Sequence, residues 1–251
     1  MMGQPIPTIT KNLLIINGLF FLATLVFETK GVDLSVVLGA FYPGSPNFHG
    51  WQVITHMFMH GGFSHLLFNM FSLWMFGSTV ELTIKNKNFI KLYLLAGFGG
   101  FILFNLANYI EISQLKQLVQ GDGISLAEVY NASKLNFNRD LINQTTAEVA
   151  NNGNAVALAQ KYITPMVGAS GAIYGVLVAF AVLYPDAKLS LFFFPVGIKA
   201  KYFIPIIMCY ELFMGVKGYS WNNVANFAHL GGALIGFLFI RNWKKNRFRI
   251  N

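Results

Sequence analysis

The sequence is poor in charge and in cysteine, and both shortages exclude whole classes of protein. Of its 251 residues, 11% are charged, whereas soluble domains carry about 25%. Too little polar sequence is present to cover the one or two soluble domains that this length would allow. The single cysteine, Cys209, excludes an intrachain disulfide framework and any metal site built from several cysteines.

Acidic residues are also scarce, since 10 Asp and Glu stand against 18 Lys and Arg and give a net charge of +8. Such an excess can indicate nucleic-acid binding. Here, however, the cations lie in short clusters between apolar stretches and in the tail that holds Lys244, Lys245, Arg247 and Arg249. That distribution is typical of charge that sets membrane topology, so we expect no nucleic-acid partner.

Apolar sequence is what the chain has in excess, with 55% hydrophobic residues, 25 Phe and 24 Gly. A transmembrane helix needs about 20 mainly apolar residues. We expect the first stretch to be a retained helix and not a signal peptide, because it lacks a small-residue cleavage site and ends in a segment that holds Glu28 and Lys30. We therefore predict an all-α membrane protein, one domain over 1–251, with six transmembrane helices near 12–28, 62–84, 88–112, 164–184, 200–217 and 225–242.

Two connections between these helices are long. Residues 29–61 hold Phe41, Tyr42, Phe48 and Trp51, and aromatic rings favour the membrane interface, so we predict an interfacial first loop. Residues 113–163 are rich in Asn, Gln, Ser and Ala. They predict a polar inserted loop between the third and fourth helices, with some helix possible within 125–150.

The distribution of Lys and Arg predicts the orientation. Of the 18 cations, twelve fall on the side of the N-terminus and six on the other side. The positive-inside rule then places both termini in the cytoplasm, with 243–251 as a basic cytoplasmic tail. Both long connections, and the start of the fourth helix, face outward.

Ser170 lies at the head of the fourth predicted helix, in a Gly-Ala-Ser-Gly segment. Pro165 breaks the chain before it, and Gly168 allows backbone N–H groups to turn toward a substrate oxygen. Gly171 and Gly175 lie on one helical face, where another helix can approach closely. A serine in such a motif is either a bystander in helix packing or a nucleophile.

His229 lies at the head of the sixth predicted helix. Ala228, Gly232 and Gly236 recur every four residues and line one helical face beside it. Because helices four and six both begin on the outer side, we expect Ser170 and His229 at similar depth, within hydrogen-bond reach. A serine hydroxyl is a poor nucleophile until a base takes its proton. The pair therefore predicts Ser170 as nucleophile and His229 as general base.

His65 and Asn69 lie four residues apart, on one face at the outer end of the second helix. Both side chains donate hydrogen bonds, as an oxyanion hole requires, and the Ser170 N–H would complete it. The spacing of His56 and His60 also fits two zinc ligands, but Met follows His56 where the zinc-protease motif carries Glu. We expect no metal, and structural roles for His56 and His60.

Two of the acids within the predicted helices, Glu81 and Glu211, are candidates for a functional role. Glu81, close in sequence to Lys85 and Lys87, is expected to make a structural hydrogen bond or charge contact. Glu211 is expected to pair inside the helix bundle. Neither is assigned to catalysis, because both are placed too far toward the cytoplasm or on the wrong helix.

Together these residues resemble the rhomboid intramembrane proteases over most of the chain. The pattern His-x₃-His-x₄-His-x₃-Asn begins at His56 and ends at Asn69, and Glu81 follows twelve residues later. Gly-x-Ser-Gly occupies 168–171 with a tyrosine at Tyr174, and Ala-His-x-x-Gly occupies 228–232. The combination is more specific than any one motif.

The resemblance implies a serine endopeptidase with a Ser170–His229 dyad and no third acid. It also implies an oxyanion hole of His65, Asn69 and the Ser170 amide, and Tyr174 stacked on the histidine. Substrates would be single transmembrane helices in the bilayer, cut near the outer face at small residues, with no metal or organic cofactor. Structural support would come from Gly168, Gly171, Tyr174, Gly232, His56, His60 and Glu81.

The chain departs from the family pattern at Gln52, which follows Trp51 where an arginine is common. Loss of that anchor would loosen the first loop. The alternative function is a catalytically silent rhomboid-like protein that binds transmembrane segments, although such proteins typically lose the Ser or the His. If the source is bacterial, the plasma membrane is the expected location.

Overall fold

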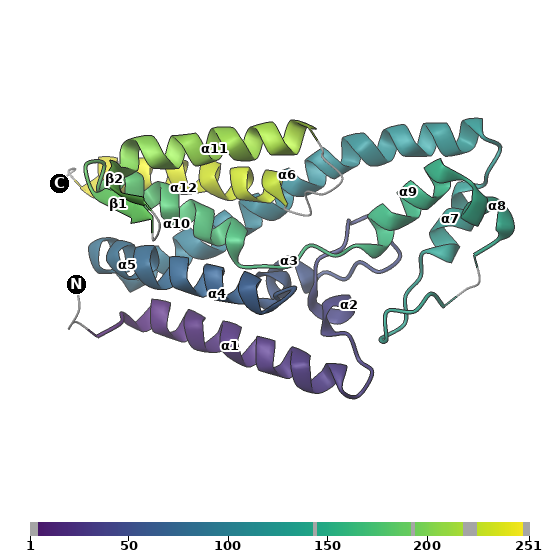
Figure 1. Cartoon of the computed structure of the whole chain (residues 1–251), viewed down its shortest axis with the longest axis horizontal. Helices are drawn as coiled ribbons and strands as arrows, with labels where there is room; N and C mark the ends of the chain where they lie inside the picture. The colour runs from purple at the N-terminus through teal and green to yellow at the C-terminus, as the bar shows by residue number, and fades with distance from the viewer. Residues whose placement is uncertain (1–4, 143–144, 192–193, 218–224, 248–251) are drawn as a thin grey trace. The chain divides into compact units, whose positions relative to one another are not determined.

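The computed structural model describes residues 5–142, 145–191, 194–217 and 225–247. The chain is mainly helical and divides into two compact units (Figure 1). The first unit comprises Met1–Asn17, Gly62–Phe104 and Ala169–Asn251, and the second comprises Gly18–Gly61 and Asn105–Gly168. Two long helices, α1 (Thr8–Glu28) and α6 (Asn86–Gly121), contribute residues to both. The basic tail was predicted over 243–251, and its last residues, 248–251, lie outside the described part.

The described helices coincide with the six predicted apolar stretches, so the helical fold class is confirmed in outline. By length and composition, α1 and α6 could each cross a membrane, and α10 is a shorter apolar helix. The crossing of a membrane by the other helices stays a prediction. Besides α1 and α6, the first unit contains α4 (Phe63–Ser72), η2 (Leu73–Gly77), α5 (Ser78–Ile84), α10 (Ser170–Leu183), α11 (Ala200–Lys217) and α12 (Asn226–Arg247).

The second predicted helix is built from three consecutive pieces. α4, the π-helical turn η2 and α5 follow one another without a gap from Phe63 to Ile84. Large apolar side chains of this segment point outward, and Phe63 and Phe68 are 65% and 71% exposed. Continuous exposed apolar surface is unusual on a soluble monomer and is expected where a protein meets lipid or a partner.

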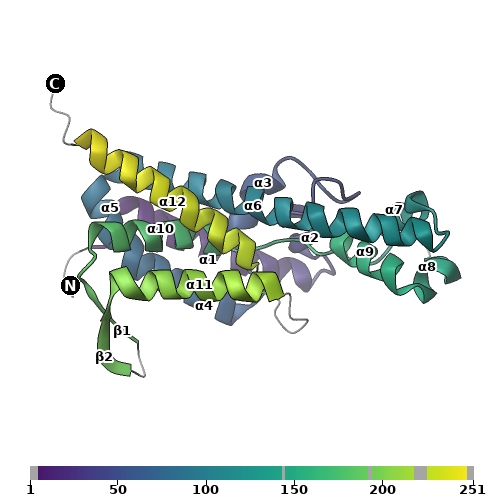
Figure 2. The same cartoon turned by 90° about the horizontal axis from the view of Figure 1, so that it is seen from above.

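A two-stranded hairpin interrupts the all-α prediction. Strands β1 (Lys188–Leu191) and β2 (Phe194–Lys199) pair antiparallel between α10 and α11, with Lys188 opposite Lys199 (Figure 2). From the sequence, these residues are expected only to connect two helices. An apolar run this short has no periodicity that distinguishes a strand from a helix end.

Glu81 binds the N-terminus of α1. Its carboxylate accepts hydrogen bonds from the N–H groups of Ile9 and Thr10, at 2.8 and 2.7 Å, and from the Thr10 hydroxyl at 2.7 Å. The first N–H groups of a helix have no intrahelical acceptor, and the helix dipole favours a negative charge there. The contact is thus to α1, rather than to Lys85 or Lys87, which neighbour it in sequence.

Much of the inserted segment is helical, both within the 125–150 range where helix was predicted as possible and outside it, so it is not a loop throughout. α6 continues to Gly121, and α7 (Leu126–Ala132), α8 (Ala147–Asn151) and α9 (Gly153–Ile163) follow. Their apolar residues are few but share one core, and the many Asn, Gln and Ser residues between them concealed the pattern. The core holds Ile112, Val119, Ile124, Val129, Val149, Ala155, Leu158 and Tyr162.

Polar side chains connect this helical insertion to residues 29–61 within the second unit. The Asn47 amide donates to the Ser133 and Tyr162 carbonyls, at 2.8 and 3.2 Å, and accepts from the Leu135 N–H at 3.0 Å. Because Asn47 is buried, these bonds satisfy groups that water does not reach. They fix the insertion to the first long connection.

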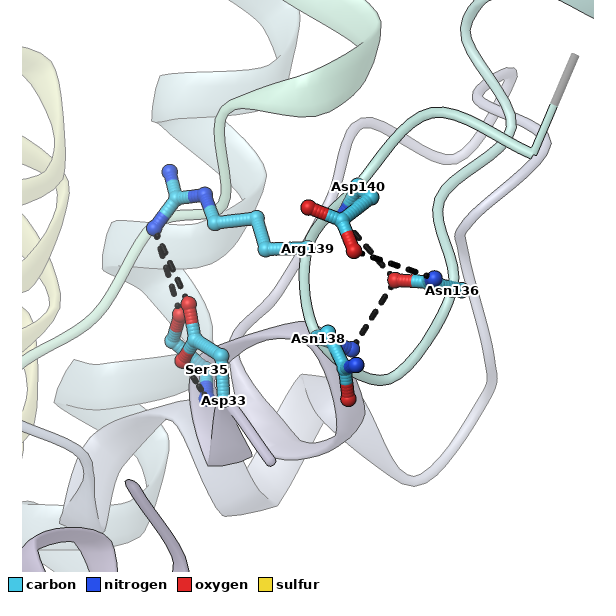
Figure 3. A network of polar contacts seen from close by, with 6 residues as sticks. All are labelled: Asp33, Ser35, Asn136, Asn138, Arg139 and Asp140. Atoms are coloured by element: carbon cyan, nitrogen blue, oxygen red, sulfur yellow. Dashed lines mark hydrogen bonds and ion pairs between the residues drawn. The ribbon is translucent and has the colours of Figure 1, made fainter. Parts of the chain in front are cut away.

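A second connection joins the same two segments at the surface. Arg139 has a left-handed φ of 67° and directs its guanidinium to Asp33 Oδ2, 3.3 Å away (Figure 3). The Asp33 N–H donates to the Phe137 carbonyl at 2.8 Å. The turn that presents Arg139 is held by Asn136, whose side-chain oxygen accepts from the N–H groups of Asn138 and Asp140, each at 2.9 Å.

Gln52 anchors the first long connection from inside, contrary to the loosening expected from the missing arginine. This segment contains α2 (Leu34–Leu38), α3 (Gln52–Thr55) and η1 (His56–Phe58). The Gln52 side chain is fully buried. Its Oε1 accepts from the His49 N–H at 3.0 Å, and its Nε2 donates to the Asn47 carbonyl at 3.1 Å. A neutral amide therefore ties the segment to its own backbone.

His56 and His60 are buried in this second unit. His56 Nδ1 lies 2.8 Å from the Gln52 carbonyl, and the His56 carbonyl accepts from the Gly168 N–H at 2.9 Å. Burial lowers the pKa of His56 to about 4, so the ring is neutral and Nδ1–H can donate to Gln52. The His56 side chain therefore bonds the backbone one turn before it, and the His56 backbone carbonyl joins this segment to Gly168.

We predict that Gln52→Leu opens residues 36–52 locally. The substitution keeps the side-chain bulk but leaves the His49 N–H and the Asn47 carbonyl without these partners, at a cost of about 1–3 kcal/mol. Hydrogen–deuterium exchange should be faster in this segment. Gln117→Leu, at an exposed position of α6, is the matched control, and equal protection in both variants would contradict the anchoring role.

Candidate active site

Ser170 is the first residue of α10. Ahead of it, the chain is irregular from Thr164 to Ala169, and Gly168 adopts φ 127°, a conformation that side chains with Cβ rarely take. The helix thus begins six residues later than the apolar stretch predicted. As an N-terminal residue of α10, Ser170 has an N–H group without an intrahelical acceptor.

His229 lies in the first turn of α12, three residues after its start at Asn226. Its Nε2 atom is 2.8 Å from Ser170 Oγ. The imidazole also stacks on the Tyr174 ring, with centroids 4.0 Å apart and planes 5° from parallel. Ser170 and Tyr174 come from successive turns of α10, so that one helix presents both groups to the histidine.

The close approach of α10 and α12 brings Ser170 and His229 together. A Cβ on Gly232 would lie 1.8 Å from the Gly171 carbonyl oxygen, and one on Gly236 would lie 2.3 Å from that of Gly175. Only glycine permits this backbone contact. The two contacts are one helical turn apart, and they set the axial register in which the serine and the histidine are level.

α12 is packed equally closely on α6. A Cβ on Gly231 would lie 2.4 Å from the Gly99 carbonyl oxygen, and one on Gly100 would lie 2.7 Å from that of Ala228. Glycines on two sides of α12 thus leave this helix little freedom to shift. The position of His229 is therefore set by backbone contacts as well as by its own side chain.

His65 and Asn69 both belong to α4, which packs against α10. Asn69 is buried, and its Nδ2 group has no hydrogen-bond partner within the described part of the chain. An unsatisfied buried donor costs about 1–3 kcal/mol and calls for an explanation. His65 is half-buried and interacts electrostatically with His229. The Asn69 amide is thus a donor available to an oxygen atom that enters the site.

Glu211 pairs inside the helix bundle, as expected, and one of its partners is His229. Glu211 is buried in α11, and its Oε1 atom lies 3.0 Å from His229 Nδ1. In two consecutive antiparallel helices, the end of the first lies at the same depth as the start of the second. Glu211 lies six residues before the end of α11 at Lys217. This counting, together with the cost of an acid in an apolar helix, was the signal that could have identified it.

Within the described ranges, no group of three or more His, Cys, Asp or Glu residues is placed to hold a metal ion. The polar groups that meet at His229 are instead one serine, one tyrosine and one carboxylate, together with the nearby His65.

Comparison with known proteins identifies the family. A family model described as Rhomboid domain matches residues 47–112 and 142–243. The chain is 27% identical to Rhomboid protein 1, mitochondrial, of Saccharomyces cerevisiae over 188 residues, which cover 75% of this chain and 40% of that protein. It is 26% identical to RHOMBOID-like protein 12, mitochondrial, of Arabidopsis thaliana over 197 residues, or 78% of this chain and 47% of that protein.

A shorter match connects the chain to a bacterial protein. It is 38% identical to Rhomboid protease GluP of Bacillus subtilis over 52 residues, which cover 21% of this chain and 10% of that protein. Against the two mitochondrial relatives, the chain spans less than half of their length.

We predict that Gly232→Ala destabilises the protein. The new methyl group would meet the Gly171 carbonyl and push α10 from α12, and overpacking of this kind costs about 1–3 kcal/mol. Gly18→Ala in α1 is the matched control, because a Cβ there has nothing within 4 Å. The control should gain up to about 1 kcal/mol in helix propensity. Chemical denaturation in detergent micelles measures both, and an unchanged Gly232→Ala variant would refute the close contact.

Proposed function

Because this chain belongs to the rhomboid family, whose members are embedded in membranes, we propose that it is a serine endopeptidase that cleaves transmembrane helices. Ser170 is the nucleophile and His229 the general base. The observation that carries the proposal is the 2.8 Å distance between His229 Nε2 and Ser170 Oγ. At this distance a neutral imidazole accepts the serine proton as the hydroxyl attacks a carbonyl carbon.

The reaction proceeds in two stages. Attack by Ser170 transfers its proton to His229 Nε2, which returns it to the leaving amine, and the acyl-enzyme forms. Water, activated by the same imidazole, then hydrolyses the ester. Stacking on Tyr174 holds the plane of the imidazole, so the ring meets both the serine and the later water in one orientation.

Asn69, His65 and the Ser170 N–H form the oxyanion hole. The tetrahedral intermediate carries a negative oxygen that needs donors already in place. The buried Asn69 Nδ2 group, without a protein partner in the described part of the chain, supports this assignment. The Ser170 N–H has no intrahelical acceptor, because it lies at the helix N-terminus, and it is next to the carbon that Ser170 attacks.

The substrates are single transmembrane helices, cut near the outer face at small residues. Six membrane-spanning helices surround the site in this proposal, and the substrate enters laterally, past α11. The excess of Lys and Arg supports an orientation with both termini in the cytoplasm, in the plasma membrane if the source is bacterial. The Bacillus subtilis relative is named a protease, which supports hydrolysis as the activity.

We predict that Ser170→Ala and His229→Ala each reduce cleavage of a transmembrane test substrate to the level without enzyme. The first variant removes the nucleophile and the second its base. A fluorophosphonate probe should label the unsubstituted protein and leave Ser170→Ala unlabelled. Ser125→Ala, at the exposed N-cap position of α7, is the matched control and should label fully.

Two results of this experiment would refute the assignment. Cleavage by purified Ser170→Ala would place the nucleophile elsewhere. Absence of both labelling and cleavage in the folded, unsubstituted protein would favour a silent rhomboid-like protein that binds transmembrane segments.

We predict that Asn69→Ala lowers kcat by about 10²–10³-fold, the cost of one oxyanion donor. KM should change little, because the donor acts on charge that develops after binding. Steady-state kinetics in detergent or liposomes measures both constants. Asn242→Ala, at an exposed position of α12, is the control, and undiminished turnover by Asn69→Ala would remove Asn69 from the oxyanion hole.

A further inference from the structure

The acid that faces the histidine has a geometry beyond that of a two-residue site. Glu211 Oε1 lies 3.0 Å from His229 Nδ1, while Nε2 of the same ring lies 2.8 Å from Ser170 Oγ. Nε2 makes a hydrogen bond with the hydroxyl, whereas Nδ1 lies at ion-pair distance from the carboxylate without the alignment of a hydrogen bond. The side chains of Glu211 and His229 are 6% and 9% exposed, so that water competes little for this contact.

The carboxylate is itself held by two further donors. The Tyr174 hydroxyl donates to Oε1 at 2.5 Å, and the Asn226 amide donates to Oε2 at 2.5 Å. Tyr174 comes from the helix that carries Ser170, and Asn226 lies one turn before His229. Glu211 is thus fixed by the same two helices that position the reacting side chains.

The surroundings of Glu211 favour its charged form. Both oxygens accept hydrogen bonds, and the third neighbour, His229 Nδ1, lies within hydrogen-bond distance. A buried carboxylate is tolerated when donors of this kind surround it. An ionised Glu211 beside Nδ1 favours the tautomer that carries its hydrogen on Nδ1, which leaves the lone pair of Nε2 directed at Ser170.

We propose that Glu211 is the positioning residue of a Ser170–His229–Glu211 relay, in place of the two-residue dyad implied by the family resemblance. The inference rests on the proposed function. The serine proton moves to His229 Nε2 and then to the leaving amine, while Glu211 stays ionised throughout. Glu211 fixes the tautomer with Nδ1–H and stabilises the imidazolium that forms when Ser170 attacks.

A purely structural role would have different consequences. Glu211 also links α11 to α10 and α12, through Tyr174 and Asn226. If this link were its only role, an isosteric amide would lower stability and leave the pH dependence of turnover unchanged. The pH profile therefore distinguishes the two roles.

The interpretation of the pH profile depends on which groups face His229. These are Ser170 and Tyr174 from α10, Glu211 from α11, and His65 from α4, whose charge interacts with that of His229. Of these, Glu211 is the acid, and its neutralisation removes the negative charge beside the imidazolium. The histidine then protonates less readily, so that activity persists to lower pH.

The experiment measures kcat, KM and the pH profile of kcat/KM for Glu211→Gln in detergent or liposomes. Amide substitution of the acid in a Ser-His-Asp protease costs about 10⁴-fold in kcat, and Tyr174 stacking retains part of the ring orientation here. We expect kcat to fall by about 10²–10⁴-fold, KM to change little, and the acid limb of the profile to move to lower pH. Glu148→Gln on α8, which is exposed, is the matched control.

Glu211→Asp keeps the charge but shortens the reach to Nδ1, and it serves if the amide variant does not fold. Its kcat should fall while the acid limb stays in place. Unchanged kcat in either folded variant, or a Glu211→Gln profile that coincides with that of the unsubstituted protein, overturns the relay. The proposed function fails separately, if the unsubstituted protein neither cleaves nor takes up the fluorophosphonate at Ser170.

Discussion

The distance between the backbones of α10 and α12 is set by the absence of side chains at Gly171, Gly175, Gly232 and Gly236. In a lipid environment helices gain no hydrophobic advantage by associating, so that close van der Waals contact and polar bonds must hold them. With glycine at these positions, α10 and α12 lie nearer to each other than they could with any larger residue there. Ser170, Tyr174 and His229 meet because of this approach, since all three lie on the two helices within a turn or two of the contact.

Buried acids in the first unit follow one rule, that each carboxylate is surrounded by donors. Glu81 accepts hydrogen bonds from the N–H groups of Ile9 and Thr10 at the start of α1. Glu211, beside His229, accepts hydrogen bonds from the side chains of Tyr174 and Asn226. Burial of a carboxylate without such partners would cost far more free energy than one helix–helix contact contributes. The same requirement holds for neutral groups in the second unit, where Asn47 and Gln52 satisfy buried backbone groups.

Sequence patterns predicted the helices well where apolar residues are dense. The stretches near 62–84, 200–217 and 225–242 are helical within a few residues. They failed where apolar residues are sparse, as in 113–163, whose core residues are separated by Asn, Gln and Ser. Sequence patterns also failed to predict β1 and β2, because each of these short strands is stabilised by pairing with the other. The anchoring role of Gln52 was not predicted from the sequence. One amide can replace an arginine only where several backbone groups lie around it, and the fold decides where those groups lie.

The sequence by itself determined the apolar stretches, the glycine-lined faces and the family motif that contains Ser170 and His229. These are local properties, carried by composition and by spacing along one helix. Only the tertiary structure decided which side chains face each other across helices. Glu211 and His229 Nδ1 are neighbours because of the rotation of α11 and α12 about their axes and the depth at which the two helices pack. The spacing of residues along one helix contains no information on the rotation or depth of that helix relative to another.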